Sequence, residues 1–351
     1  GERDEDAIIL PPYLKEAYDH AERFCNMLKD RAPAGGFLKT LLLKRIGSSI
    51  VAGHNTADKM LTDWGKEDID DEEDDDSILD EEKVERRGRK PSNSGGSDIK
   101  QLTDSEKEEL RLLTEKLKIN KDLDPKYHKV REILFDWNWI ERGCIIFTQY
   151  YDSAKWLAQK LSEEKPELIV GVYAGGDKSG IFISGVFHRK QREDLKLMVR
   201  QREMKLLVGT DAASEGLNLQ TLSTLINLDL PWNPTKLEQR KGRIQRIGQV
   251  MDEVWIYNLR YKESVEDRVH NLLASRLKEI YDMFGQLPDV LEDVWVKVAE
   301  NEIEEAKKIV DSVPAQHPFA IRNSTIEHID WETCSTVLDA VEKKKVLMQG
   351  W

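Results

Sequence analysis

Two arginines and one glutamine near residue 240 share one face of a predicted helix. Gln239, Arg243 and Arg246 are spaced at i, i+4 and i+7, and side chains with that spacing lie on the same side of an α-helix. Arginine is always charged and presents planar donors, which suit the negative charge that spreads over a γ-phosphate during phosphoryl transfer. The spacing alone is also compatible with an exposed basic helix that carries ordinary surface salt bridges.

A second polar cluster follows the apolar run 206–208. Thr210 and Asp211 come after this run and one glycine, and Gly216 lies further along the same connection. Glycine and small residues allow backbone amides to approach a phosphate closely. The same residues would also form a simple tight turn between a strand and a helix, so the cluster by itself leaves both interpretations open.

Short apolar runs that alternate with helical patterns connect these clusters. The runs predict strands at 144–147, 168–172, 206–208, 224–228 and 254–258, with helices between them at 153–161, 188–200 and 235–246. This alternation predicts an α/β fold with a parallel sheet covered by helices on both faces. Ligands bind beyond the carboxyl ends of such strands, so the two clusters would meet there with Thr148 and Gln149. That pair alone could be only a polar strand end.

The net charge of −13 comes from one stretch of the chain. Residues 67–82 include 12 acidic side chains and no basic one, so the other residues carry a net charge of −1, which is −13 less the −12 of the tract. The bulk acidity therefore does not exclude a nucleic-acid-binding groove elsewhere. Over 67–100 the sequence is acidic, then basic, then rich in Ser and Gly, which predicts a flexible insertion. We interpret it as a solvated linker rather than an acidic binding tail.

The composition also bears on where in the cell the protein is found. There is no run of about 20 apolar residues that could span a membrane, and the first residues lack the apolar core of a secretory signal. Cys25, Cys144 and Cys334 are widely spaced and form neither a metal-binding pattern nor an even disulfide set. These features predict a cytoplasmic protein without a protein-bound metal cluster.

Taken together, the polar clusters resemble helicase motifs. Residues 145–150 are similar to motif IV, 207–220 to motif V and 239–249 to motif VI of the C-terminal lobe of superfamily 2 helicases. Residues 229–234 resemble the lead-in to motif VI of the Swi/Snf-type translocase branch, and residues 237–240 resemble its bacterial RapA type. Residues 43–49 and 124–126 are similar to a segment that bridges the two lobes in such proteins. The resemblance covers about residues 37–300.

The resemblance implies an architecture. It implies a RecA-like lobe over 101–262, a helical lobe-bridging segment over 1–66 and a helical C-terminal extension over 263–351, with the acidic insertion between the first two. Residues 264–290 are similar to a helical extension of bacterial Swi/Snf-type proteins, some of which act in phage defence. The connection 175–187 is longer than the usual link before the next helix.

The resemblance also implies roles for individual residues. Arg243 and Arg246 would be arginine fingers, and Gln239 would order the interface between the lobes. Asp211 and Gly216 would join the two arginines in nucleotide binding and, with Thr210, would couple the nucleotide state to the DNA backbone. The contacts with the tracked strand would come from Thr148, Gln149, Thr210, Ser214 and Asn218. Such contacts would reach phosphates rather than base edges, so movement would not depend on sequence.

One expected part of a motor is missing from the sequence. A Walker A loop needs two glycines at a fixed spacing before its Lys, and residues 176–179 lack the second glycine. ATP with Mg²⁺ would therefore be bound mainly by an N-terminal RecA-like lobe of a parent protein, and the chain alone is expected to be inactive. The parent would be a double-stranded DNA translocase with nucleic-acid-stimulated ATPase activity.

Two other functions compete with this prediction. The chain could be a non-catalytic RecA-like interaction module that recruits RNA polymerase or a defence-system protein. It could also belong to a helicase that separates strands of RNA, although residues 232–234 and 247–249 favour the translocase branch. Intact motifs V and VI argue against a purely non-catalytic module, because such a module need not keep Gln239, Arg243 and Arg246 on one face.

Overall fold

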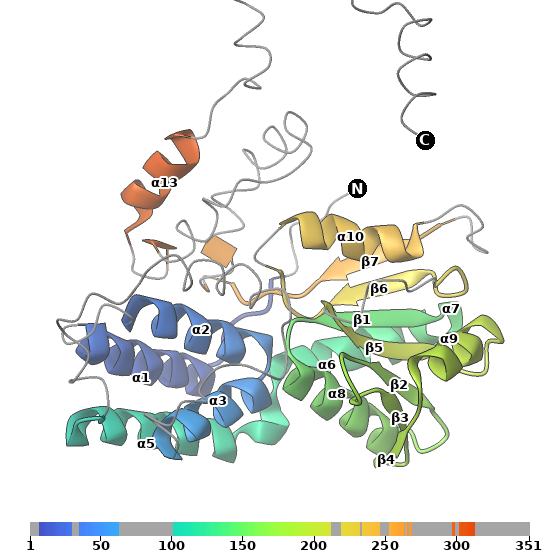
Figure 1. Ribbon diagram of the computed structural model, residues 1–351, viewed down its shortest axis with the longest axis horizontal. Helices are drawn as coiled ribbons and strands as arrows, with labels where there is room; N and C mark the ends of the chain where they lie inside the picture. Colours follow the sequence, from blue (N-terminus) through green and yellow to red (C-terminus); the bar gives the residue numbers. More distant parts are fainter. Residues whose placement is uncertain are drawn as a thin grey trace, which may run out of the picture.

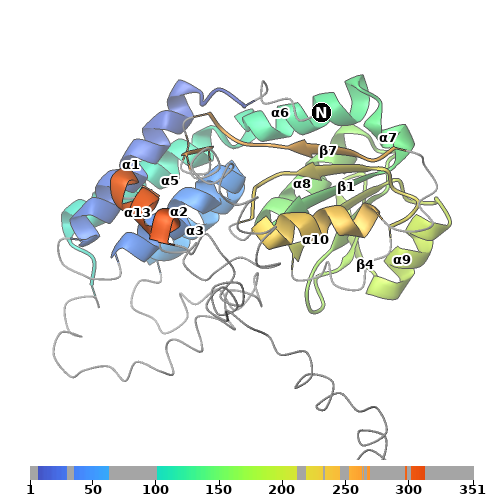
Figure 2. The ribbon, with the colours of Figure 1, turned by 90° about the horizontal axis from the view of Figure 1, so that it is seen from above.

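A helical bundle and a helix-covered sheet lie side by side (Figures 1 and 2). The computed structural model of the chain describes residues 7–29, 35–62, 101–211, 219–231, 234–245, 253–262, 264, 267–268, 297–298 and 302–312. The predicted insertion at 67–100 and most of the predicted C-terminal extension lie outside these residues. Within them, no helix is both long and apolar enough to cross a membrane.

The bundle is formed by segments from both sides of the acidic insertion. Its helices are α1 (Pro12–Lys29), α2 (Gly35–Ser48), α3 (Ile50–Thr62) and α5 (Asp104–Ile119), and their buried side chains form one core. The predicted capping box begins α5: the Thr103 side chain accepts from the Glu106 N–H, and the Glu106 carboxylate accepts from the Thr103 N–H. Because α5 packs against α1 and α3, the predicted domain boundary at residue 101 differs from the packing.

The sheet contains five parallel strands and an antiparallel hairpin at one edge. The strands are β1 (Cys144–Thr148), β2 (Val170–Tyr173), β3 (Gly180–Ile183), β4 (Val186–Arg189), β5 (Leu206–Thr210), β6 (Thr224–Asn227) and β7 (Trp255–Asn258), in the spatial order β4-β3-β2-β5-β1-β6-β7. All five predicted strands are present and run parallel to one another. The α/β fold is therefore confirmed.

The hairpin β3–β4 corrects two details of the prediction. The sequence pattern predicts a long connection over 175–187 and a helix from residue 188, whereas β4 continues to Arg189 and helix α9 spans Arg192–Arg200. Ile181 and Phe182 are buried where β3 pairs with β2. The chain then reverses at Ser184 and Gly185, whose φ angles are 49° and 79°. Two consecutive positive φ angles are typical of the tight turn that joins antiparallel strands.

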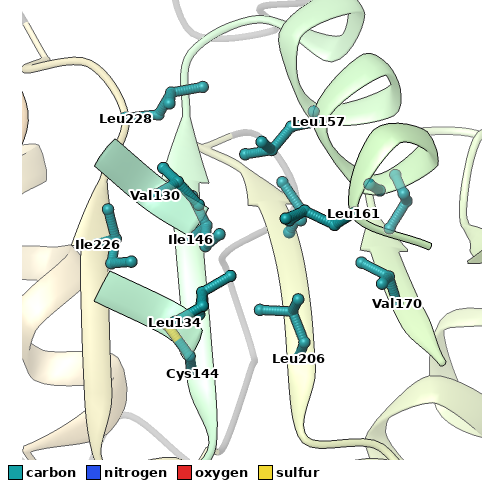
Figure 3. Close-up of a cluster of buried hydrophobic side chains, with 14 of the residues drawn as sticks. Val130, Leu134, Cys144, Ile146, Leu157, Leu161, Val170, Leu206, Ile226 and Leu228 are labelled. Atoms are coloured by element: carbon teal, nitrogen blue, oxygen red, sulfur yellow. The ribbon is translucent and has the colours of Figure 1, made fainter. Parts of the chain in front are cut away.

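Helices cover both faces of the sheet, as predicted. On one face lie α6 (Pro125–Arg131), the π-helix η2 (Glu132–Asp136), α7 (Trp139–Arg142) and α8 (Tyr151–Glu164). Leu157 and Leu161 of α8 pack there against the strands (Figure 3). The other face is covered by α9 and α10 (Pro234–Ile244). Each buried aliphatic side chain of this size contributes about 1.5–3 kcal/mol.

The last described helix belongs with the bundle rather than with the sheet. Helix α13 spans Ile303–Ser312, and its Ala306 is buried in the bundle core. Tyr261, just after β7, is buried in the same core. After the last strand the chain therefore returns to the bundle. The bundle thus contains residues from before the sheet and residues from after it.

The two buried cysteines are expected to resist alkylation in the native chain. Cys25 lies in the bundle core and Cys144 in the sheet core, and burial raises the pKa of each thiol to about 12. The thiolate is the nucleophile, so on the order of 10⁻⁴ of each thiol is reactive at about pH 8. Iodoacetamide labelling followed by peptide mass spectrometry should show both cysteines modified only after denaturation. Fast native labelling of one of them would show that its core opens.

Candidate functional site

The polar clusters meet at the carboxyl edge of the parallel strands. Thr148 at the end of β1 pairs with Thr210 at the end of β5, and Asp229 follows β6, the other neighbour of β1. Helix α10 leaves the same edge and crosses one face of the sheet (Figures 1 and 2). The predicted gathering of Thr148, Thr210 and the motif VI helix is therefore present in the fold.

Arg240 fixes helix α10 to the ends of the strands. Its side chain is 1% exposed. The guanidinium makes a bidentate pair with Asp211, with Nε–Oδ1 at 2.6 Å and Nη2–Oδ2 at 2.8 Å. It also donates to the side-chain oxygen of Asn227 and to the carbonyl of Asp229, both at 2.9 Å. The donors thus reach the ends of β5 and β6 together.

This buried arginine remains charged. Burial by itself lowers the pKa of Arg240, but the carboxylates of Asp211 and Asp229 more than offset that effect and raise the pKa above its ordinary value. The second carboxylate lies 3.6 Å from Nη2. A charge without such partners would be strongly unfavourable in this position. The pair therefore specifies how α10 sits on the sheet.

The periodicity of α10 places two of the predicted catalytic side chains beside the face that packs on the sheet. Arg240 and Ile244 are buried at i and i+4, so they define the face that packs on the sheet. Gln239 is exposed and Arg243 is half-buried. These two residues also share an i, i+4 relation, and Arg243 follows the buried Arg240 by three residues, so Arg243 lies on the flank of the packed face and Gln239 further toward solvent. Arg246, the second predicted arginine finger, lies outside the described residues.

Asp211 is engaged inside the protein rather than open to a nucleotide. Its side chain is 9% exposed and both of its oxygens accept from Arg240. In this structure Asp211 makes an anchoring contact with Arg240 of the motif VI helix. Its role in nucleotide binding stays a prediction. Ser214, Gly216 and Asn218, predicted in the same connection, lie outside the described residues.

Thr148 and Gln149 also face inward. The Thr148 hydroxyl donates to Asp229 Oδ2 at 2.5 Å, and the Gln149 backbone N–H donates to Oδ1 at 2.9 Å. The Gln149 side chain donates to the Leu230 carbonyl at 2.9 Å. Thr148 is fully buried, and Gln149 and Thr210 are 6% and 2% exposed. In this arrangement Thr148 and Gln149 hold the Asp229 carboxylate, and their predicted contact with nucleic acid stays a prediction.

The turn between α2 and α3 enters this network from the bundle. The Ser48 hydroxyl donates to Asp229 Oδ2 at 2.6 Å and lies 2.9 Å from the Ser153 hydroxyl at the start of α8. Ser49 lies 2.7 Å from the same Ser153 hydroxyl. All three serines are fully buried. Asp229 therefore joins the bundle, α8 and the end of β1 through one buried carboxylate.

A second buried link lies next to the first. Asp124 caps α6 by accepting from the backbone N–H of Lys126 at 2.9 Å, and its other oxygen accepts from the Ile50 N–H at 2.8 Å. Lys126 is fully buried and its ammonium donates to the Leu228 carbonyl at 2.6 Å. The Arg45 guanidinium lies 4.4 Å from the centre of the Tyr150 ring. Residues 43–49 and 124–126, which resemble a lobe-bridging segment, thus contact the sheet edge directly.

Two central residues of this site were not assigned a role in the sequence analysis. Arg240 was read only as part of motif VI, and Asp229 only as part of its lead-in. A signal for Arg240 was available, because it lies four residues before Ile244 and three after Leu237, on the apolar face of the helix. A charged residue on such a face requires a buried partner of opposite charge. These partners, Asp211 and Asp229, come just after two of the strands that the apolar runs predict.

Replacing Ser48 with alanine is expected to destabilise the junction between bundle and sheet. The change removes a donor to the buried Asp229 carboxylate, and hydrogen bonds to charged groups contribute about 1.5–3 kcal/mol. Urea unfolding should show this loss in the free energy of unfolding. Thr62→Ala is the matched control, because that exposed hydroxyl bonds only within its own helix, and it should change stability by less than about 0.5 kcal/mol. Equal effects of the two changes would contradict the role of Ser48.

Comparisons with known proteins agree with the motif pattern. The helicase conserved C-terminal domain family matches residues 125–248. An uncharacterized ATP-dependent helicase, YqhH of Bacillus subtilis, is 35% identical over 164 residues, which are 47% of this chain and 27% of YqhH. The RNA polymerase-associated protein RapA of Vibrio atlanticus is 30% identical over 121 residues, 30% of this chain and 12% of RapA. The chain thus corresponds to a minor part of each relative's length.

A solved structure that aligns with this chain is the C-terminal part of the Fun30 ATPase domain. It is 17% identical with a TM-score of 0.44, and the alignment covers 86% of this chain and 96% of that one. The family match begins at Pro125, where α6 starts after the bundle. Residues 125–248 of this chain therefore match the helicase conserved C-terminal domain family.

Proposed function

We propose that this chain is the second motor lobe of an ATP-driven translocase that moves along double-stranded DNA. The observation that supports the proposal is the fixed orientation of α10. Its buried face is held by the Arg240–Asp211 pair, with Arg243 half-buried on the flank of that face and Gln239 exposed. A partner lobe that carries ATP could therefore meet a guanidinium whose helix is already positioned.

In this proposal, residues of this chain place positive charge near the nucleotide, and another lobe makes most of the contacts that bind it. The described residues include no cluster of His, Cys, Asp and Glu suited to a metal ion. We assign Mg²⁺ and the triphosphate mainly to an N-terminal RecA-like lobe, because residues 176–179 lack the second glycine of a Walker A loop. When bound there, the nucleotide supplies the bond that is hydrolysed. Arg243, together with Arg246, would stabilise the charge that develops on the γ-phosphate.

Hydrolysis in this proposal depends on closure of the two lobes. The guanidinium of Arg243 contributes only where it reaches the phosphate, so it stabilises the transition state more than the open ground state. Rigid attachment of α10 serves this purpose, since a loosely held arginine would have to be ordered during each cycle. The buried links through Asp229 and Asp124 would make the bundle and the sheet move as one body.

The experiment that tests the proposal uses a protein that carries this chain together with its nucleotide-binding lobe. We expect ATP hydrolysis to be stimulated by duplex DNA of any sequence, and a third strand to be displaced from a triplex as the protein moves. Strand separation of an RNA duplex without triplex displacement would favour the helicase alternative. Absence of nucleic-acid-stimulated hydrolysis would refute the motor proposal.

A non-catalytic interaction module is the second candidate. It is favoured by the similarity to relatives that are named as RNA polymerase-associated proteins. In that case RNA polymerase should be retained by the immobilised chain, and retention should survive replacement of both Arg243 and Arg246. Retention that is lost with the arginines, or that never occurs, would argue against the module.

A further inference from the structure

A row of basic side chains surrounds the open end of the β3–β4 hairpin. Lys178 precedes β3, Arg189 ends β4, and Lys190 and Arg192 follow at the start of α9. Arg189 and Lys190 are exposed, as is the neighbouring His188. We call Lys178, Arg189, Lys190 and Arg192 the hairpin rim. None of these residues belongs to the motifs identified in the sequence.

The hairpin rim lies at the same edge of the sheet as the candidate site. Tyr173 at the end of β2 pairs with Gly209 of β5, so the loop after β2 emerges beside the end of β5. The Lys178 ammonium lies 5.0 Å from the centre of the Tyr151 ring, and the Tyr151 hydroxyl donates to the Lys178 carbonyl at 3.4 Å. Tyr151 is two residues after Gln149. The rim therefore continues the edge at which nucleic acid is expected.

The loop that carries the rim is closed by internal hydrogen bonds. The buried Ser179 hydroxyl accepts from the Ala174 N–H at 3.1 Å and donates to the Ala174 carbonyl at 2.9 Å. Arg192 Nε donates to the same carbonyl at 3.0 Å. Side chains on a loop held in this way lose less freedom when they bind a ligand than side chains on a loose loop. The loop is thus a preformed support for the cations.

Asp177 is the acidic residue that pairs directly with the rim. Asp177 forms an ion pair with Arg189, and both side chains are well exposed, at 82% and 55%. Exposed pairs of this kind are weak, so a phosphate could replace the carboxylate. Glu193 lies at the start of α9 but is paired with Lys196 at 2.7 Å. The four cations of the rim therefore outnumber the nearby carboxylates, which are Asp177 and, in the first turn of α9, Glu193 and Asp194.

We propose that the hairpin rim binds the phosphate backbone of duplex nucleic acid. The inference rests on the proposed function, because it extends the expected nucleic-acid surface past β2. An acidic protein partner is disfavoured by the position of the apolar side chains. The exposed Ile183 and Val186 flank the turn at the opposite end of the hairpin, so the rim lacks the apolar centre that protein interfaces usually have.

Charge removal tests the proposal. In the full 351-residue chain, Lys178→Gln/Lys190→Gln should reduce the slope of log affinity against log salt for short duplexes by about 1.8, or about 0.9 per lost phosphate contact. The control is Lys15→Gln/Lys118→Gln, which removes the same charge from exposed positions on the bundle. It should leave the slope unchanged. Fluorescence anisotropy over a KCl series measures both, with two unrelated duplex sequences.

A variant that is expected to bind duplex more tightly tests the same proposal, because misfolding would not increase affinity. Asp177→Asn releases Arg189 and removes the facing carboxylate, so duplex affinity should rise and the salt slope should steepen by about 0.9. An unchanged slope in both rim variants would overturn the inference, as would an equal loss of binding to a polyglutamate peptide. Absence of duplex binding by the unmodified chain would also overturn it. The ATPase experiment on the two-lobed protein then decides the proposed function separately.

Discussion

Replacing Arg243 with alanine is expected to lower nucleic-acid-stimulated ATP hydrolysis by about 10³–10⁵-fold in the two-lobed protein, while ATP binding stays close to normal. The reason is that the guanidinium would contact the phosphate mainly in the closed state, so its loss raises the barrier and not the dissociation constant. Arg243 is half-buried on α10 and lies four residues from the exposed Gln239. Arg246→Ala is expected to have the same effect. Turnover and nucleotide binding are measured on the same preparation.

Two controls make this result specific. Arg111→Ala removes an equal charge from an exposed site on α5 and should leave turnover unchanged. Arg243→Lys keeps the charge but loses the planar donor set, so it should recover only a small part of the activity. Near-normal turnover of Arg243→Ala and Arg246→Ala would refute the arginine-finger assignment. A parallel loss of ATP binding would mean that the two arginines bind ATP before hydrolysis as strongly as they stabilise the transition state.

The parallel part of the fold could be predicted from the sequence because its signal is local. Strands buried on both faces appear as short apolar runs, and each of the five runs became a strand with fully or largely buried side chains, except at the edge strand β7. The capping box at Thr103 is equally local. The packing of α5 with α1 and α3 is not local, since it joins segments separated by the acidic insertion, and no periodicity within either segment specifies it.

The hairpin and the site network show where local patterns become ambiguous. Residues 180–189 include a two-residue turn at Ser184 and Gly185, but their polar second strand resembles the start of the following helix. In the site, sequence order places Thr148, Thr210 and Asp229 at strand ends, yet it does not determine which side chains bond to each other. Arg240 uses the carboxylate of Asp211 that we expected to face a nucleotide.

Removing Asp211 is expected to be among the most destabilising single changes in the sheet domain. Asp211→Ala leaves the Arg240 guanidinium buried with the more distant Asp229 carboxylate at 3.6 Å. Breaking a buried ion pair from one side costs about 3–5 kcal/mol. The free energy of unfolding from urea titrations should fall by that amount. Native labelling of Cys144, which lies in the sheet core, should accelerate more than labelling of Cys25 in the bundle.

A double-mutant cycle separates the buried charge from the loss of packing. Arg240→Met should also be destabilising, because Asp211 and Asp229 lose their shared cation. The double variant Asp211→Ala/Arg240→Met should cost clearly less than the sum of Asp211→Ala and Arg240→Met. The matched control is the exposed Lys205–Glu141 pair, whose atoms lie 2.6 Å apart and whose Glu141→Ala variant should lose no more than about 1 kcal/mol. Additive effects in the cycle would mean that Arg240 and Asp211 stabilise the sheet independently. The orientation of α10, and with it the presentation of Arg243, would then need another cause.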